Sequence, residues 1–129
     1  MDYYKETIEK IREFNEERDW DQFHTPKDVA ISVSLEANEL LELFQWKTDE
    51  EVENLLKNDE KYVSEMKDEI ADITNYLLVL CDKIGVDLLE SVNTKLEKVK
   101  KKYPVDKCKG RADKYTAYIE HKEEHRKNK

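Results

Sequence analysis

Four acidic side chains stand in two pairs of equal spacing, each within an apolar stretch: Glu36, Glu39, Glu69 and Asp72. The first pair lies in VSLEANELLELFQW and the second in EMKDEIADITNYLLVLC. Residues three apart share one face of an α-helix, so each stretch predicts a helix with two carboxylates on one side. If these two helices pack antiparallel, the four carboxylates converge.

Carboxylates within an apolar stripe indicate a metal site. A buried carboxylate normally takes up a proton, finds a partner or binds a cation, and oxygen-only ligand sets suit Mg²⁺, with Mn²⁺ as a substitute. A metal ion also lowers the pKa of a bound water, whose proton a neighbouring carboxylate can accept. Glu36 and Glu39 are our candidates for this catalytic base. The alternative is that the acids only line solvated helix flanks, because the chain carries 31 acidic residues.

The elements that must position these acids are long helices. The chain has 129 residues, of which 42 % are charged, and only two glycines and two prolines. So little turn punctuation favours one all-α domain over a many-stranded sheet. Apolar periodicity and cap residues such as Thr25, Thr48 and Gly85 predict helices over residues 3–17, 26–46, 49–56, 60–84 and 88–103. The last helix is expected to bury Leu88, Val92, Leu96, Val99 and Tyr103.

Charge and hydropathy narrow the class of partner. The net charge of −8 disfavours a nucleic-acid backbone or an anionic membrane surface. The first twenty residues lack the apolar core of a signal peptide, and no uncharged run approaches a membrane span. Cys81 and Cys108 are interpreted as reduced thiols, with a disulfide between them left open. We therefore expect a cytoplasmic protein.

An aromatic segment, RDWDQFHTP, separates the first two predicted helices. Trp20, Phe23 and His24 suit a stacking platform for a flat ligand such as a nucleobase, with His24 supplying a hydrogen bond. The alternative is that the aromatic rings close one end of a helical bundle. Lys95 and Lys102 share a basic line on a later helix, which indicates either solubility or contact with distant phosphates.

The two acidic pairs and several short segments together resemble the MazG-like all-α nucleotide pyrophosphohydrolases. Within that family the chain is most similar to the dCTP pyrophosphatases, over roughly residues 8–116. The segments that carry this likeness, besides the acidic pairs and Tyr76, are ERDWDQFHTP, ELFQWK, VDL, KYPV and KYT.

The resemblance implies a four-helix fold that assembles as an intertwined dimer or a dimer of dimers. Residues 1–116 would form the domain, and residues 117–129 a polar, Lys-rich tail. The implied reaction is Mg²⁺-dependent cleavage of a dNTP, dCTP or a modified dCTP above all, to the dNMP and pyrophosphate, which cleans the nucleotide pool. Glu36, Glu39, Glu69 and Asp72 would bind the metal. The implied substrate-binding residues are Trp20, His24, Trp46, Tyr76, Lys95, Lys102, Arg111 and Lys114.

Two alternatives to this function stay open. Val99 stands where members of the family tend to carry asparagine, and valine cannot donate the corresponding hydrogen bond. This departure favours a related pyrophosphatase with broad or different dNTP specificity, for example towards dUTP or damaged dNTPs. The second alternative is a non-catalytic helical interaction protein whose acids are solvated.

Overall fold

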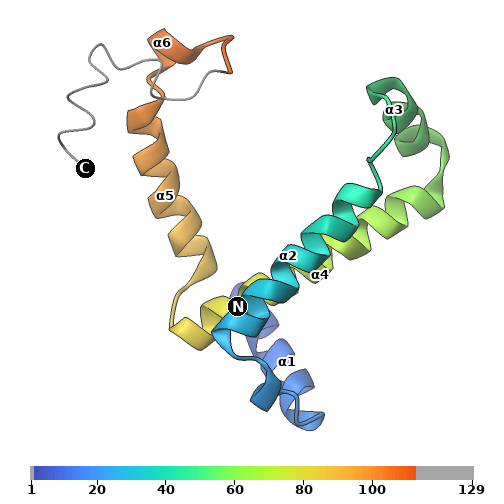
Figure 1. The fold of residues 1–129 in the computed structure, drawn as a ribbon. Coiled ribbons are helices and arrows are strands. Elements are labelled where there is room, and N and C mark those ends of the chain that lie inside the picture. Colours follow the sequence, from blue (N-terminus) through green and yellow to red (C-terminus); the bar gives the residue numbers. More distant parts are fainter. Residues whose placement is uncertain (1, 113–129) are drawn as a thin grey trace. The chain divides into compact units, whose positions relative to one another are not determined.

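The structure is a computed structural model that describes residues 2–112. In these residues the chain is all helical, without a strand (Figure 1). The elements are α1 (Tyr3–Glu17), the short 3₁₀ helix η1 (Asp21–Phe23), α2 (Pro26–Glu42), α3 (Asp49–Asn58), α4 (Glu60–Ile84), α5 (Leu88–Lys102) and α6 (Val105–Cys108). The all-α class predicted from the sequence is confirmed, with four helices of 15 residues or more. No helix of the described residues is both long and apolar enough to cross a membrane.

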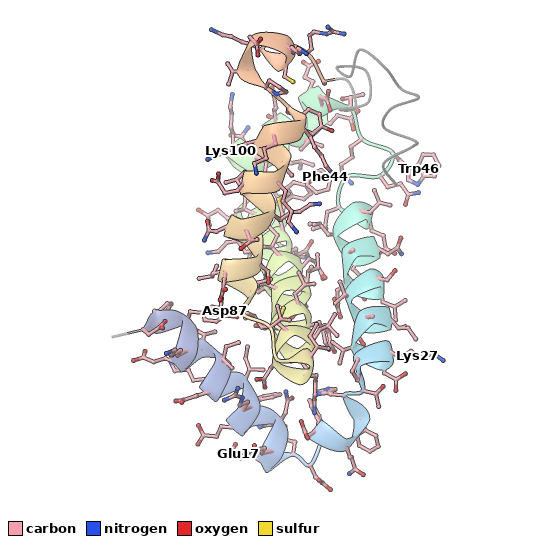
Figure 2. All side chains as sticks on the ribbon, turned by 90° about the vertical axis from the view of Figure 1, so that its left-hand side faces the viewer. Glu17, Lys27, Phe44, Trp46, Asp87 and Lys100 are labelled. Carbon is pink, nitrogen blue, oxygen red and sulfur yellow. The ribbon has the colours of Figure 1, made fainter. Side chains whose placement is uncertain are left out.

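The described part of the chain divides into two units, residues 2–88 and residues 89–112. In the first unit, α2 and α4 run antiparallel and lie side by side, with α3 at the turn between them (Figures 1 and 2). At the α3 end, the hydroxyl of Tyr62 donates to the carbonyl of Leu43 over 2.7 Å. Helix α1 packs against α4. The hairpin of α2 and α4 is therefore the frame of the first unit.

Side-chain caps explain where the helices begin and end. The hydroxyl of Thr25 accepts from the amide of Asp28 over 3.2 Å, and that of Thr48 accepts from the amide of Glu51 over 3.1 Å. These bonds satisfy amides that have no partner within the helix. Gly85 ends α4 with a φ of 72°, in the left-handed region that favours glycine. The predicted caps at Thr25, Thr48 and Gly85 are confirmed.

The prediction that the second helix continues to Trp46 is wrong. Helix α2 ends at Glu42, and residues 43–46 form tight turns in which the amide of Phe44 donates to the carbonyl of Leu41. Trp46 adopts a φ of 69°, which cannot continue a right-handed helix. The chain turns here because α3 must lead back to α4. The short helix α6 was not predicted either.

The buried apolar core of the described residues is small: Val29, Tyr62, Leu78 and Val79. Many large apolar side chains of the first unit are exposed, among them Ile31, Leu35, Leu41, Ile70 and Ile84. In α5, Val92 and Leu96 are 54 % and 49 % exposed, so the stripe predicted to be buried is half-exposed in the single chain. The helices thus carry more apolar surface than one chain covers.

Candidate metal and nucleotide site

Three of the four predicted metal ligands meet in the first unit. Glu36 comes from α2, and Glu69 and Asp72 come from α4; one carboxylate oxygen of each lies within 4.8 Å of the others. The antiparallel packing of α2 and α4 produces this meeting, because it brings the acidic face of each helix against the other. We call these three residues the acidic cluster.

Glu39 lies at the edge of the acidic cluster. It is not among the three residues whose oxygens share the 4.8 Å range, but its charge reaches both neighbours. Its carboxylate helps to raise the pKa of Glu36 and that of Glu69. The fourth predicted ligand is thus close enough to interact with the cluster, although the other three are grouped more tightly.

The electrostatics of the acidic cluster are those of a cation site. Burial, followed by the neighbouring Glu39, raises the pKa of Glu36 to about 7, and burial also raises the pKa of Glu69. The Oε2 atoms of Glu36 and Glu69 are buried and have no hydrogen-bond partner among the described residues. Orphaned carboxylate oxygens from two facing helices are the donor set of a hard divalent ion. The residues present therefore fit a divalent metal.

A cavity of about 420 Å³ adjoins the acidic cluster, and Asp72 belongs to both. Four of its eleven lining residues carry rings, Phe14, Trp20, His24 and Tyr76, and we call it the aromatic cavity. The Phe14 and Trp20 rings meet edge to face with centroids 5.6 Å apart. Concave sites of this size, lined by apolar and aromatic side chains with a few polar groups, accept small organic ligands, and here Asp72 makes one part of the lining acidic.

Local structure at the end of α1 builds the aromatic wall. Asp19 adopts a φ of 54°, which turns the chain out of the helix, and the amide of Trp20 donates to the carbonyl of Asn15 over 2.9 Å. The ammonium group of Lys83 then pairs with the Asp21 carboxylate. Residues Trp20 to His24 are therefore held against α4, the helix that supplies Tyr76 and Asp72.

The structure brings together Trp20, His24 and Tyr76 of the predicted substrate-binding residues, but not Trp46. The side chain of Trp46 is 92 % exposed and does not line the cavity. Figure 2 shows it beyond the far end of α2 from Lys27. A helix of 17 residues is about 25 Å long, which separates Trp46 from the aromatic segment that precedes α2.

The predicted phosphate-binding residues belong to the other part of the chain. Lys95, Lys102 and Arg111 lie in the second unit. Lys95 and Lys102 are exposed on α5, and Arg111 follows α6. Lys114 lies outside the described residues. Their predicted contacts with phosphate stay predictions.

Sequence reasoning missed several residues that line the cavity: Thr7, Lys10, Ile11, Phe14, Asn15 and Asn75. Most of them come from α1, a helix in which no site residue was predicted. A signal was present, because Thr7, Ile11, Phe14 and Asn15 have the spacing of one helical face that leads directly into the aromatic segment. Asn75 precedes Tyr76 on α4.

A family model described as MazG-like matches residues 31–117 of the chain. The chain belongs to the MazG-like family. The match includes both acidic pairs and most of the hairpin of α2 and α4 that brings three of the acids together. The family resemblance that the sequence motifs predicted is confirmed.

The relatives to which the chain is similar are pyrophosphatases. The chain is 40 % identical to dCTP pyrophosphatase 1 of Bos taurus and 36 % identical to that of Homo sapiens, over 85 % of this chain in each case. It spans 67 % and 66 % of their lengths, or about two thirds. It is also 42 % identical to a pyrophosphatase of known structure from Archaeoglobus fulgidus, with a TM-score of 0.73 over 81 % of this chain and 94 % of that one. The predicted class, a nucleoside triphosphate pyrophosphatase, is confirmed.

Proposed function

We propose that this MazG-like chain is a Mg²⁺-dependent pyrophosphohydrolase of deoxynucleoside triphosphates, with dCTP or a modified dCTP as the preferred substrate. The observation that carries the proposal is the position of Asp72, which belongs to the acidic cluster and also lines the aromatic cavity. A nucleotide has the same polarity, with an anionic triphosphate at one end and a flat base at the other. The names of the mammalian relatives support dCTP as the substrate.

The acidic residues divide two tasks between them. Glu36, Glu39, Glu69 and Asp72 would hold the ion, and Mg²⁺ is the divalent cation that best suits an all-carboxylate set. When bound, Mg²⁺ would neutralise triphosphate charge and acidify water. Glu36 or Glu39 would take the proton of the attacking water as general base. The bond between the α- and β-phosphates breaks, and the products are the dNMP and pyrophosphate.

The aromatic cavity would bind the base and the sugar. Trp20 and Tyr76 offer faces for stacking. The Nδ1 atom of His24 is buried without a hydrogen-bond partner among residues 2–112, which leaves it free to bond a polar atom of the nucleotide. Following the family likeness, Lys95, Lys102, Arg111 and Lys114 would contact the phosphates.

We further propose that the enzyme is a homodimer or a dimer of dimers. Ile31, Leu35 and Leu41 of α2 are exposed, and Trp46 is 92 % exposed. Apolar helix faces of this extent normally lie in an interface. Trp46 would then complete the nucleotide site of a second copy, which reconciles its predicted role with its distance from the cavity of its own chain. Light scattering gives the oligomeric state, and a monomer would contradict this arrangement.

Pyrophosphate release from a panel of dNTPs and NTPs, with and without Mg²⁺, tests the proposed function. We expect release that requires metal and is fastest with dCTP or 5-methyl-dCTP. Fast release from dUTP as well would favour the broad specificity that Val99 suggests. No release from any nucleotide would overturn the proposal and favour a chain that has the fold without the reaction.

A further inference from the structure

An ion pair joins the aromatic segment to α4. The ammonium group of Lys83 pairs with the Asp21 carboxylate and also donates to the backbone carbonyl of Asp21 over 3.5 Å. The same carbonyl accepts from the amide of His24 over 3.1 Å. Lys83 therefore contacts both the side chain and the backbone of Asp21, which directly follows Trp20 and is bonded to His24.

The ion pair lies behind the wall of the aromatic cavity. Asp21 and Lys83 line a smaller cavity, of about 20 Å³, together with Ile11, Asn15 and Val79. These last three residues also line the aromatic cavity, whereas Asp21 and Lys83 do not. A nucleotide in the aromatic cavity would thus contact the residues that the ion pair holds in place, and not the ion pair itself.

Apart from this ion pair, local contacts hold the aromatic segment. The Trp20 ring contacts Phe14, and the other hydrogen bonds of the segment to described residues join groups no more than five residues apart. Trp20 is 45 % exposed and Phe23 is 63 % exposed. Segments with little buried surface open at a low cost in free energy. An ion pair between residues 62 apart in sequence is therefore important for the position of this segment.

We infer that Asp21 and Lys83 are positioning residues for substrate binding, because their ion pair holds Trp20 and His24 where they face the nucleotide. The inference rests on the proposed function, which assigns the aromatic cavity to the base and the sugar. A segment that is already in its binding conformation loses less entropy when the ligand binds. The acidic cluster lies on α2 and α4, so the ion pair should affect binding more than the chemical step.

Lys83→Met and Asp21→Asn each break the ion pair at nearly constant side-chain size. We expect either variant to raise KM for dCTP by about three- to fivefold with little change in kcat, because a partly exposed ion pair is weak. The double variant should raise KM no further than either single one, since both remove the same interaction. Lys83→Arg keeps the charge and should restore most of the affinity.

Lys61→Met is the matched control. Lys61 pairs with Glu65 over 3.8 Å on the same helix and does not line the aromatic cavity, so kcat and KM should not change. An unchanged KM in Lys83→Met would overturn the inference, and so would an equal rise in Lys61→Met or a loss confined to kcat. In each of these cases, metal-dependent release by the unmodified enzyme would still support the proposed function.

Quenching of Trp20 fluorescence by acrylamide gives a readout that needs neither nucleotide nor turnover. Trp20 and Trp46 are the two tryptophans of the chain, so Trp46→Phe leaves Trp20 as the reporter. In this background we expect Lys83→Met to raise the quenching constant by about 1.5- to twofold, because the segment opens more often, and Lys61→Met to leave it unchanged.

The two readouts separate the inference from the proposed function. An unchanged quenching constant in Lys83→Met would overturn the inference even when the unmodified enzyme turns over dCTP. A raised quenching constant with an unchanged KM would do the same, because the segment would then move without affecting the substrate. An unmodified enzyme that releases no pyrophosphate from any nucleotide would overturn the proposed function, and the inference with it.

Discussion

Helix α4 carries two kinds of acidic residue, and the difference between them is informative. Asp82, near its C-terminal end, accepts from the Nε of Arg12 over 2.8 Å and also from Nη2, and this pairing lowers the pKa of Asp82. Asp72 lies in the same helix among two further carboxylates, whose pKa values are raised. The carboxylate near the C-terminal end of α4 is neutralised by an arginine of the same chain. The carboxylate in the middle of α4 lies among other carboxylates instead.

The contrast extends to the groups around each region. Lys83, next to Asp82, pairs with the Asp21 carboxylate and so fixes the aromatic segment. The buried polar atoms without a hydrogen-bond partner among the described residues, in contrast, belong to the acidic cluster and the cavity: Glu36 Oε2, Glu69 Oε2 and His24 Nδ1. Charged groups that stabilise the fold are paired within the chain. We interpret the buried polar groups without partners as groups that bind ligands.

The largest effect is expected from Asp72→Asn. Neutralising this carboxylate removes charge from both the metal site and the nucleotide cavity. We expect pyrophosphate release to fall on the order of 10²- to 10³-fold, with an unchanged or raised Tm in EDTA because repulsion within the acidic cluster decreases. Steady-state kinetics with dCTP and a thermal scan measure the two quantities.

Asp82→Asn provides the matched control on the same helix. It makes the same chemical change ten residues away, at the carboxylate that pairs with Arg12. Because this carboxylate is outside the acidic cluster, the variant should retain most of the turnover. If Asp82→Asn and Asp72→Asn reduced activity equally, the functional distinction between the ion-paired Asp82 and the Asp72 of the acidic cluster would be wrong.

An intermediate effect is expected from Glu36→Gln in metal-free protein. The pKa of Glu36 is about 7 in the folded chain, against the ordinary value of 4.5. The folded state therefore holds this proton more tightly, and the stability that it contributes below pH 4.5 is lost as the pH rises towards 7. Glutamine does not titrate and therefore avoids this loss. We expect the loss in the free energy of unfolding to be on the order of 1–3 kcal/mol, because solvent screens part of the effect.

Thermal unfolding in EDTA at pH 5 and pH 8 checks this second prediction. Glu36→Gln should exceed the unmodified chain in Tm at pH 8 by several degrees and match it more closely at pH 5. A Tm difference that did not change with pH would contradict the assignment of the raised pKa to Glu36. Mg²⁺ at pH 8 should raise the Tm of the unmodified chain and raise that of the variant less.

The smallest effect concerns the stability of Asp82→Asn. Because Arg12 lowers the pKa of Asp82, the pair stabilises the fold above the ordinary aspartate value of 3.8, and this contribution is lost as the pH falls through the lowered value. Half-exposed ion pairs contribute little, so we expect the Tm to fall by about two degrees at pH 7. The difference should shrink as the pH falls through the lowered pKa of Asp82, and a difference that did not change with pH would contradict the role of this ion pair.

Local sequence determined the helices and the spacing of the acids. Thr25, Thr48 and Gly85 cap their helices as predicted, because a cap depends on hydrogen bonds and φ values within a few residues. The spacing of Glu69 and Asp72 likewise places both on one helical face without any other part of the chain. The all-α class and the acidic pairs were therefore predictable from the sequence.

Tertiary packing decided which of these residues meet. The register of α2 against α4 groups Glu36 with Glu69 and Asp72 and leaves Glu39 at the edge, and no local pattern encodes that offset. The packing of α1 against α4 places residues of α1, such as Phe14, in the wall of the cavity. Trp46 lies beyond the other end of α2 and does not reach it. Contacts between residues far apart in sequence depend on how whole helix faces fit together, which spacing along one helix does not specify.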